Sequence, residues 1–198
     1  MNTIDAKNPG ICRILEEYAA FELEINTYSS QLWGVVCAAC KGVCCESEYC
    51  REAIDSPFLS RLHACYSPKG VFSPEMGWLI KTGCALSLGR PPICYQFLCE
   101  KIIEAQATDE QRYLLNVFSN LINHVGKRAL GHRHLVAIMD SDQLDQLDYN
   151  RFAGRLNEAK RAFELLRTCW EQNTIDKRAL KVFAIIVPPP SAIYDLPR

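Results

Sequence analysis

The sequence predicts an all-α protein, a helical bundle with a cysteine-rich, loop-containing insert. Apolar residues recur in steps of three and four along residues 11–32 and 152–170, which is typical of long amphipathic helices. No convincing alternation of apolar and polar residues predicts a ladder of strands. Nine of the eleven cysteines lie between residues 37 and 99, a segment with few large aliphatic residues. We expect one domain, 1–198, with the insert at about 37–99, a helical body at 9–36 and 100–187, and an extended tail at 188–198.

Composition and charge narrow the class of protein. The 198 residues are 48% apolar and 23% charged, as in ordinary globular domains. The net charge is −1 and no long run has one sign, so nothing indicates binding to nucleic acid or to an anionic membrane. The N-terminus lacks the pattern of a secretory signal, and no window approaches the roughly 20 apolar residues of a spanning helix. The sequence therefore predicts a cytoplasmic protein, and it leaves a protein partner or a homo-oligomer open.

Capping signals predict where the helices begin. Asn8-Pro9 has an N-cap residue followed by proline at the first helical position, and Ser56-Pro57 and Ser73-Pro74 repeat the pattern. Thr108 with Gln111 reads as a capping box. The first predicted helix begins at Pro9. Two short helices are predicted at about 57–66 and 74–82, the second with Gly83 as its C-cap, and another runs from Pro91-Pro92 through Cys94 to Ile102. Further helices are predicted after Thr108 and after Ser141, and a long one from Asp148. Residues 178–187 fit either a helix or a strand.

Two groups of cysteines suggest a metal site. Four thiols fall within nine residues, in the pattern Cys37-x2-Cys40-x3-Cys44-Cys45, and a later element reads Cys84-x5-Arg90-Pro91-x2-Cys94. An ion bound by thiolates needs several sulfurs at about 2.3 Å, and such crowded spacing provides them. If the first group were helical, its first three thiols would share a face and the fourth would point elsewhere. In a reducing compartment this pattern favours metal binding over disulfides; the alternative is a set of buried thiols that only pack.

The two elements together resemble a family of zinc- or iron-chelating proteins named for a CxxCxxCC motif, the YkgJ-like family. Related cysteine motifs occur in flagellin lysine methylase. The resemblance covers about residues 37–99 and rests on the order and spacing of both elements, with Arg90-Pro91 at the matching place. The Cys-Pro-x-Leu element that the family often has before the second group is absent here. The resemblance implies bound zinc or iron.

The candidate ligands fall into two sets. The residues of the two motif elements are the predicted ligands: Cys37, Cys40, Cys44, Cys45, Cys84 and Cys94. Three further thiols become ligands if a second ion or a cluster is bound: Cys99, Cys50 and Cys65. Arg90 is expected to donate hydrogen bonds to thiolate sulfur and to offset its charge, unless it only forms a surface ion pair. Cys12 and Cys169 lie beside apolar stripes and are expected to pack, and His132-x-His134 is better explained as solvated or core-edge histidine than as a chelating pair.

Three functions remain open on the sequence. The first is a metal-binding protein that holds zinc or iron, the latter as an ion or as an iron–sulfur cluster, through its clustered cysteines. The second is an iron–sulfur-dependent enzyme that modifies a protein or transfers electrons. The third is a helical interaction protein whose thiols are incidental. No Gly-x-Ser-x-Gly, P-loop or Gly-x-Gly-x-x-Gly motif is present, so the corresponding hydrolases, nucleotide hydrolases and Rossmann enzymes have no support.

Overall fold

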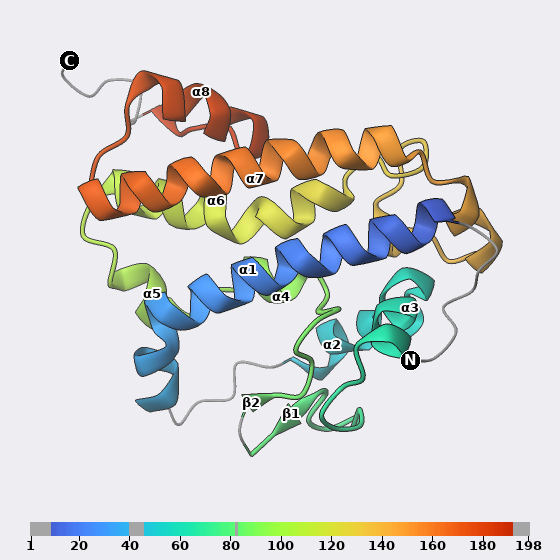
Figure 1. The fold of residues 1–198 in the computed structure, drawn as a ribbon. Helices are drawn as coiled ribbons and strands as arrows, with labels where there is room; N and C mark the ends of the chain where they lie inside the picture. Colours follow the sequence, from blue (N-terminus) through green and yellow to red (C-terminus); the bar gives the residue numbers. More distant parts are fainter. Residues whose placement is uncertain (1–8, 40–45, 82, 192–198) are drawn as a thin grey trace.

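A computed structural model describes residues 9–39, 46–81 and 83–191, with the side chains of 36–39 left out of the description. Its body is formed by three long helices, α1 (Pro9–Ala39), α6 (Asp109–Gly126) and α7 (Tyr149–Gln172). Figure 1 shows α1 and α7 running in the same direction, with α6 antiparallel to both and α8 (Lys177–Ile186) packed beside α6 and α7. The predicted all-α class is confirmed for the described part of the chain.

An aromatic core joins the three long helices. Phe118 of α6 and Phe163 of α7 both pack against Tyr28 of α1, with ring centroids 5.8 and 5.4 Å from it. Trp33, one helical turn further along α1, contacts Phe118 edge-on at 5.4 Å. Edge-to-face pairs of this kind add about 1 kcal/mol each to the energy of burying the rings. The predicted apolar stripes of α1 and α7 therefore face the interior.

Side-chain caps fix the starts of the later helices, as the sequence predicts. The Thr108 hydroxyl accepts from the Gln111 N–H at the start of α6, and Asp148 Oδ1 accepts from the N–H groups of Asn150 and Arg151 at the start of α7. Residues 177–186, where the sequence left helix and strand open, form α8 behind the N-cap Asp176. After Ser141 the chain forms a 3-10 helix, η2 (Ser141–Gln146), and a second one, η1 (Leu135–Ala137), precedes it.

The last turns of α1 bend away from the line of the rest of the helix (Figure 1). In the second half of α1, the hydroxyls of Thr27 and Ser30 donate hydrogen bonds of 2.8 Å to the carbonyls of Leu23 and Asn26, four residues back. Hydroxyl bonds of this kind compete with the helical ladder and favour bending. The bend redirects the end of α1 that leads into the first cysteine group.

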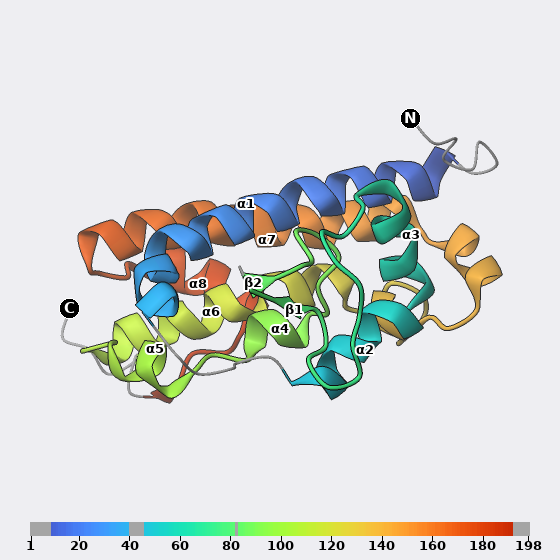
Figure 2. The ribbon, with the colours of Figure 1, turned by 90° about the horizontal axis from the view of Figure 1, so that it is seen from below.

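The first part of the insert, up to Cys84, forms two helices and a small hairpin on one face of the body (Figure 2). The helices are α2 (Ser47–Asp55) and α3 (Pro57–Cys65), and the hairpin pairs β1 (Leu79–Ile80) with β2 (Gly83–Cys84) antiparallel. The apolar residues of α3 join the main core, whereas a separate small core forms around Trp78. Its other fully buried members are Cys50, Ala53, Ala85 and Leu86.

Four predictions for this region are wrong. A helix was expected at 74–82, but residues 74–81 form none, because the Ser73 hydroxyl accepts from the N–H groups of Glu75 and Met76 in a tight turn that Gly77 closes. Gly83 is accordingly a strand residue with φ of +113° and not a helix cap, and a short strand pair exists where none was expected. The single helix expected from Pro91 to Ile102 is two short ones, separated at residues 97–99. These are α4 (Ile93–Gln96) and α5 (Glu100–Glu104).

None of the described helices combines the length and the apolar character that crossing a membrane requires.

Candidate functional site

One buried carboxylate fastens the loop at residues 86–92 to the middle of α1. Glu22 of α1 is 0% exposed. Its Oε2 accepts a hydrogen bond of 2.8 Å from the Gly89 N–H, and its Oε1 accepts from the Arg90 N–H at 2.9 Å and from the Tyr95 hydroxyl at 2.6 Å. Burial raises the pKa of Glu22, while these three hydrogen bonds and the Arg90 charge oppose the rise. Glu22 thus fixes both the loop and α4 relative to α1.

The side chain of Arg90 hydrogen-bonds to its own loop and to α1, and two of the predicted ligands influence its pKa. Its Nε donates to the Leu86 carbonyl at 2.9 Å, and its Nη1 donates to Asn26 Oδ1 at 3.3 Å. Burial opposes the positive charge, but the pKa of Arg90 is still raised by the acidic groups around it, which are Tyr95, Cys84, Glu22 and Cys94. Cys84 in β2 and Cys94 in α4 therefore both lie near one guanidinium group.

Glu22 is not among the predicted site residues, although the sequence contains a signal for it. Glu22 follows Tyr18 by four residues and precedes Ile25 by three, so it lies on the same helical face as the apolar stripe of α1. A carboxylate on a buried face needs several donors to be stable there. A carboxylate at such a position is a candidate for a structural or functional hydrogen-bond network. Because Glu24 lies two residues further on, the two glutamates together look in the sequence like part of a solvated helical face.

Gly89 is confined by its own backbone and by a histidine. Its φ is +73°, and a Cβ added there would lie 2.6 Å from His63 Nε2. The same His63 nitrogen lies 3.0 Å from the Gly89 carbonyl oxygen. Because a carbonyl only accepts, Nε2 carries the hydrogen, and burial lowers the pKa of this histidine. The turn before Arg90 therefore requires glycine.

Replacing Gly89 with alanine should destabilise the protein more than the same change at Gly131. Gly131 has a similar φ of +62° but open space around it, so Gly131→Ala should cost only the backbone strain of about 1 to 2 kcal/mol. Gly89→Ala adds the contact with His63 and should cost about 2 to 4 kcal/mol in total. Denaturant unfolding of both variants measures the difference. Equal losses of stability in the two variants would show that the His63 ring moves aside without cost.

The structure brings a third thiol toward the end of α1. Cys99 immediately precedes α5 and is half-buried against the main core. In both views α5 lies beside the last turns of α1, the part of the helix that leads to Cys37 (Figures 1 and 2). Of the three additional candidates, Cys99 is therefore the one that precedes a helix beside the last turns of α1.

The other two additional candidates lie elsewhere. Cys50 of α2 is 3% exposed, and its sulfur packs against Gly77 within the small core. Cys65 lies at the end of α3, near Cys12 and Glu16. Burial raises the pKa of its thiol, and the charges of these two neighbours add a smaller effect. Cys12 and Cys37 are separated by 25 residues of α1, about 37 Å of helix. Cys65 thus lies far from the end of α1 that carries Cys37.

Most of that first group is not described by the structure. Cys40, Cys44 and Cys45 lie outside the described residues, and Cys37 is described only as a backbone position in α1. Their predicted convergence with Cys84 and Cys94 therefore stays a prediction. Within residues 9–39, 46–81 and 83–191, no three side chains of His, Cys, Asp or Glu are gathered in a way that could hold a metal ion.

His132 and His134 are placed differently in the structure. His132 is exposed, whereas His134 is half-buried, with its Nε2 2.9 Å from the Asn123 carbonyl and its Nδ1 accepting from the Val136 N–H. His134 packs directly on Gly126. It holds η1 against the end of α6, which is the core-edge role that the sequence favoured.

Comparisons of the chain with protein-family models, with curated proteins and with solved structures found no match.

Proposed function

We propose that this protein binds zinc or iron through its clustered cysteines. The proposed ligands are Cys37, Cys40, Cys44, Cys45, Cys84 and Cys94, with Cys99 as the next candidate. Thiolate ligands select zinc, iron–sulfur clusters or cuprous copper over hard cations such as magnesium. The resemblance of the two motif elements to the zinc- or iron-chelating CxxCxxCC proteins supports the same chemistry.

The observation that carries the proposal is the position of Cys84 and Cys94 around Arg90. The two thiols come from different elements, a strand and a helix, yet the charges of both act on one guanidinium. A half-buried cation stabilises nearby thiolates, which are the form that binds metal. Arg90 would therefore offset the excess negative charge of a multi-thiolate site.

The hydrogen bonds between the Arg90 loop and α1 would hold the site in one arrangement. Glu22 and Asn26 hold the Arg90 loop on the helix whose last turns lead to Cys37. Asn26 precedes Cys37 by 11 residues, about 16 Å of helix. The two cysteine groups would thus meet through a shared helical support, and the metal would close the loop of about 40 residues between them.

Metal analysis tests the proposal. The chain purified without oxygen should contain zinc or iron in stoichiometric amount, and Cys94→Ser should lose most of it, because a hydroxyl is a poor substitute for a thiolate. A brown protein with broad visible absorbance would identify an iron–sulfur cluster, and a colourless one with zinc would identify a simple thiolate site.

A buried cysteine on α7 is the matched control. Cys169 is 6% exposed in the main core, so Cys169→Ser should leave the metal content unchanged. A folded chain that takes up neither zinc nor ferrous iron, or a Cys94→Ser variant with the full metal content, would contradict the proposal.

A further inference from the structure

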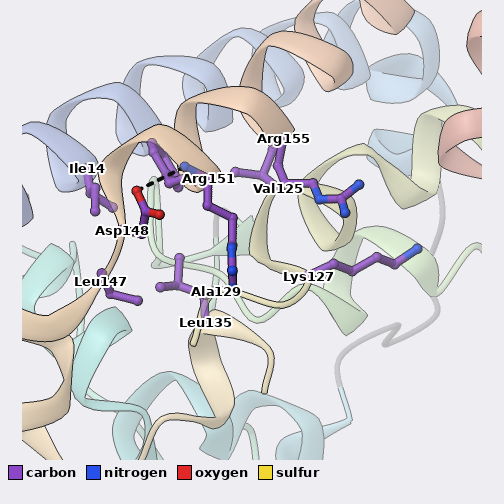
Figure 3. A pocket seen from close by; sticks show the side chains of 10 residues that line it. Ile14, Val125, Lys127, Ala129, Leu135, Leu147, Asp148, Arg151 and Arg155 are labelled. Carbon is purple, nitrogen blue, oxygen red and sulfur yellow. Dashed lines mark hydrogen bonds between the residues drawn. The ribbon is translucent and has the colours of Figure 1, made fainter. Parts of the chain in front are cut away.

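The pocket between the start of α7 and the end of α6 is too small for a ligand larger than water. Its lining comes from several elements and includes Ile14, Val125 and Leu135 (Figure 3). Its cavity volume of about 10 Å³ has room for about one water molecule. In the described part of the chain, the contacts around Arg90 therefore offer the clearer chemistry.

Asn26 of α1 contacts the Arg90 loop with both ends of its amide. Its Nδ2 donates a hydrogen bond of 3.0 Å to the Ser87 carbonyl, and its Oδ1 accepts one of 3.3 Å from Arg90 Nη1. Because a carbonyl only accepts and a guanidinium only donates, these two partners fix the amide in one orientation. An aspartate at this position would lose the bond to Ser87, and an alanine would lose both bonds.

Glu22 and Asn26 bind different parts of the same loop. The two residues are four apart in α1, so they lie one above the other on one face of the helix. Glu22 accepts from the backbone N–H groups of Gly89 and Arg90, whereas Asn26 accepts from the guanidinium of Arg90. Glu22 therefore positions the backbone of the loop, and Asn26 positions the cationic end of the Arg90 side chain.

The guanidinium that Asn26 holds lies beside the second cysteine element. Arg90 Nε donates at 2.9 Å to the carbonyl of Leu86, which follows Cys84 by two residues. The Cys94 N–H donates at 2.9 Å to the carbonyl of Pro91, the residue after Arg90. Among residues 9–39, 46–81 and 83–191, no hydrogen-bond acceptor lies against Arg90 Nη2. Part of the guanidinium thus remains for an acceptor such as a thiolate.

We propose that Asn26 is a positioning residue of the metal site: by holding the Arg90 guanidinium beside Cys84 and Cys94, it stabilises negative charge on the sulfurs that bind the metal. This inference rests on the proposed function and extends it to a residue outside both cysteine elements. A fixed cation beside a thiolate stabilises the charge of the sulfur and offsets the charge of a site with several thiolates. A guanidinium that turns out into water is screened and acts less strongly.

Cobalt(II) added to the full chain reports on this effect through its sulfur-to-cobalt charge-transfer absorption. An electron leaves sulfur in that transition, so a nearby positive charge raises the transition energy. Asn26→Ala should therefore shift the band to longer wavelength and weaken cobalt binding about three- to tenfold, and Arg90→Met should do the same with a loss of about tenfold or more. Gln31→Ala, which removes an exposed amide from α1 between Asn26 and Cys37, should change neither.

A double-mutant cycle separates this role from a general loss of stability, with circular dichroism and the melting temperature as checks that each variant is folded. If Asn26 acts through Arg90, adding Asn26→Ala to Arg90→Met should move the band and the affinity no further. Additive changes in the double variant, or an Asn26→Ala variant with the original band and affinity, would overturn this inference and leave metal binding in place. A chain that takes up no cobalt, zinc or ferrous iron would instead overturn the proposed function, and this inference with it.

Discussion

Replacing Glu22 with alanine should destabilise the protein by about 3 to 5 kcal/mol. The change leaves the N–H groups of Gly89 and Arg90 and the hydroxyl of Tyr95 buried without their acceptor. Each unsatisfied buried donor costs about 1 to 3 kcal/mol, and a typical domain has only about 5 to 15 kcal/mol in all. Denaturant unfolding measures the loss, and a metal-binding assay should show that the Arg90 loop no longer holds its thiols.

Glu22→Gln is the matched control for this prediction. The glutamine oxygen can replace Oε1 and accept from Arg90 and Tyr95, whereas its amide nitrogen then faces the Gly89 N–H, donor against donor. The loss should therefore be clearly smaller than for Glu22→Ala. An alanine variant within about 1 kcal/mol of the original chain would show that water or a shift of the loop satisfies the three donors.

The stability of the original chain and the stability of Glu22→Gln should depend differently on pH. The folded-state pKa of Glu22 lies above its ordinary value of 4.5, chiefly because of burial. The folded chain therefore keeps this proton at a pH where the unfolded chain has lost it, so the contribution of Glu22 is complete below pH 4.5 and declines as the pH rises through the folded-state pKa. The stability advantage of the original chain over Glu22→Gln should shrink across that window. An advantage that grows with pH would mean that the hydrogen bonds outweigh burial.

Removal of the metal should loosen the hairpin part of the insert while the long helices stay ordered. Structural thiolate sites contribute on the order of 10 kcal/mol of apparent binding energy, comparable with the stability of a domain. The small core around Trp78 has few large side chains of its own, whereas Phe58 and Leu59 of α3 belong to the main core. We expect amide exchange to accelerate at least about a hundredfold around residues 66–99, equivalent to about 2.8 kcal/mol of local opening energy, with α3, α6 and α7 little changed.

Hydrogen exchange on the metal-loaded, chelated and Cys94→Ser proteins measures this effect. Cys94→Ser should match the chelated chain, and Cys169→Ser should match the metal-loaded one. Equal protection of residues 37–99 in the first three samples would show that packing alone orders the insert. Amide protection reports on the order of the chain and not on whether the chain binds metal. Equal protection would therefore reject the coupling of metal to order without rejecting metal binding.

The elements that the sequence predicted correctly are those whose signals are local and repeated. Six turns of three-four spacing define α1, and a cap followed by a long stripe defines each of α6 and α7. The signal at Ser73-Pro74 is short, and a serine before proline caps a tight turn as readily as a helix. The same lack of a sustained stripe hid the break between α4 and α5. Tertiary contacts decide such short segments, and one sequence does not contain that information.

The candidate site was predictable only in part for a related reason. The spacing of Cys84, Arg90 and Cys94 suggested Arg90 as a partner of thiolate sulfur, and that role stays a prediction; the side-chain hydrogen bonds of Arg90 go to the Leu86 carbonyl and to Asn26. The attachment of that loop to Glu22, across 67 to 73 residues of sequence, depends on how the insert folds back on α1. No periodic pattern marks a cluster built from separate elements.

The long separations in sequence between α1 and its partners have a consequence for synthesis. Tyr95, a donor to Glu22, follows it by 73 residues, and Tyr149, whose hydroxyl bonds Glu17 at 2.7 Å, follows that residue by 132. At about 5 to 20 residues per second, a ribosome needs roughly 7 to 26 seconds to add those 132 residues. Throughout that time the apolar stripe of the nascent α1 lacks α7, and for about the first half of it the Glu22 carboxylate also lacks its donors. Contacts over such separations also make folding slow, so the growing chain should be a substrate for chaperones that shield exposed amphipathic helices.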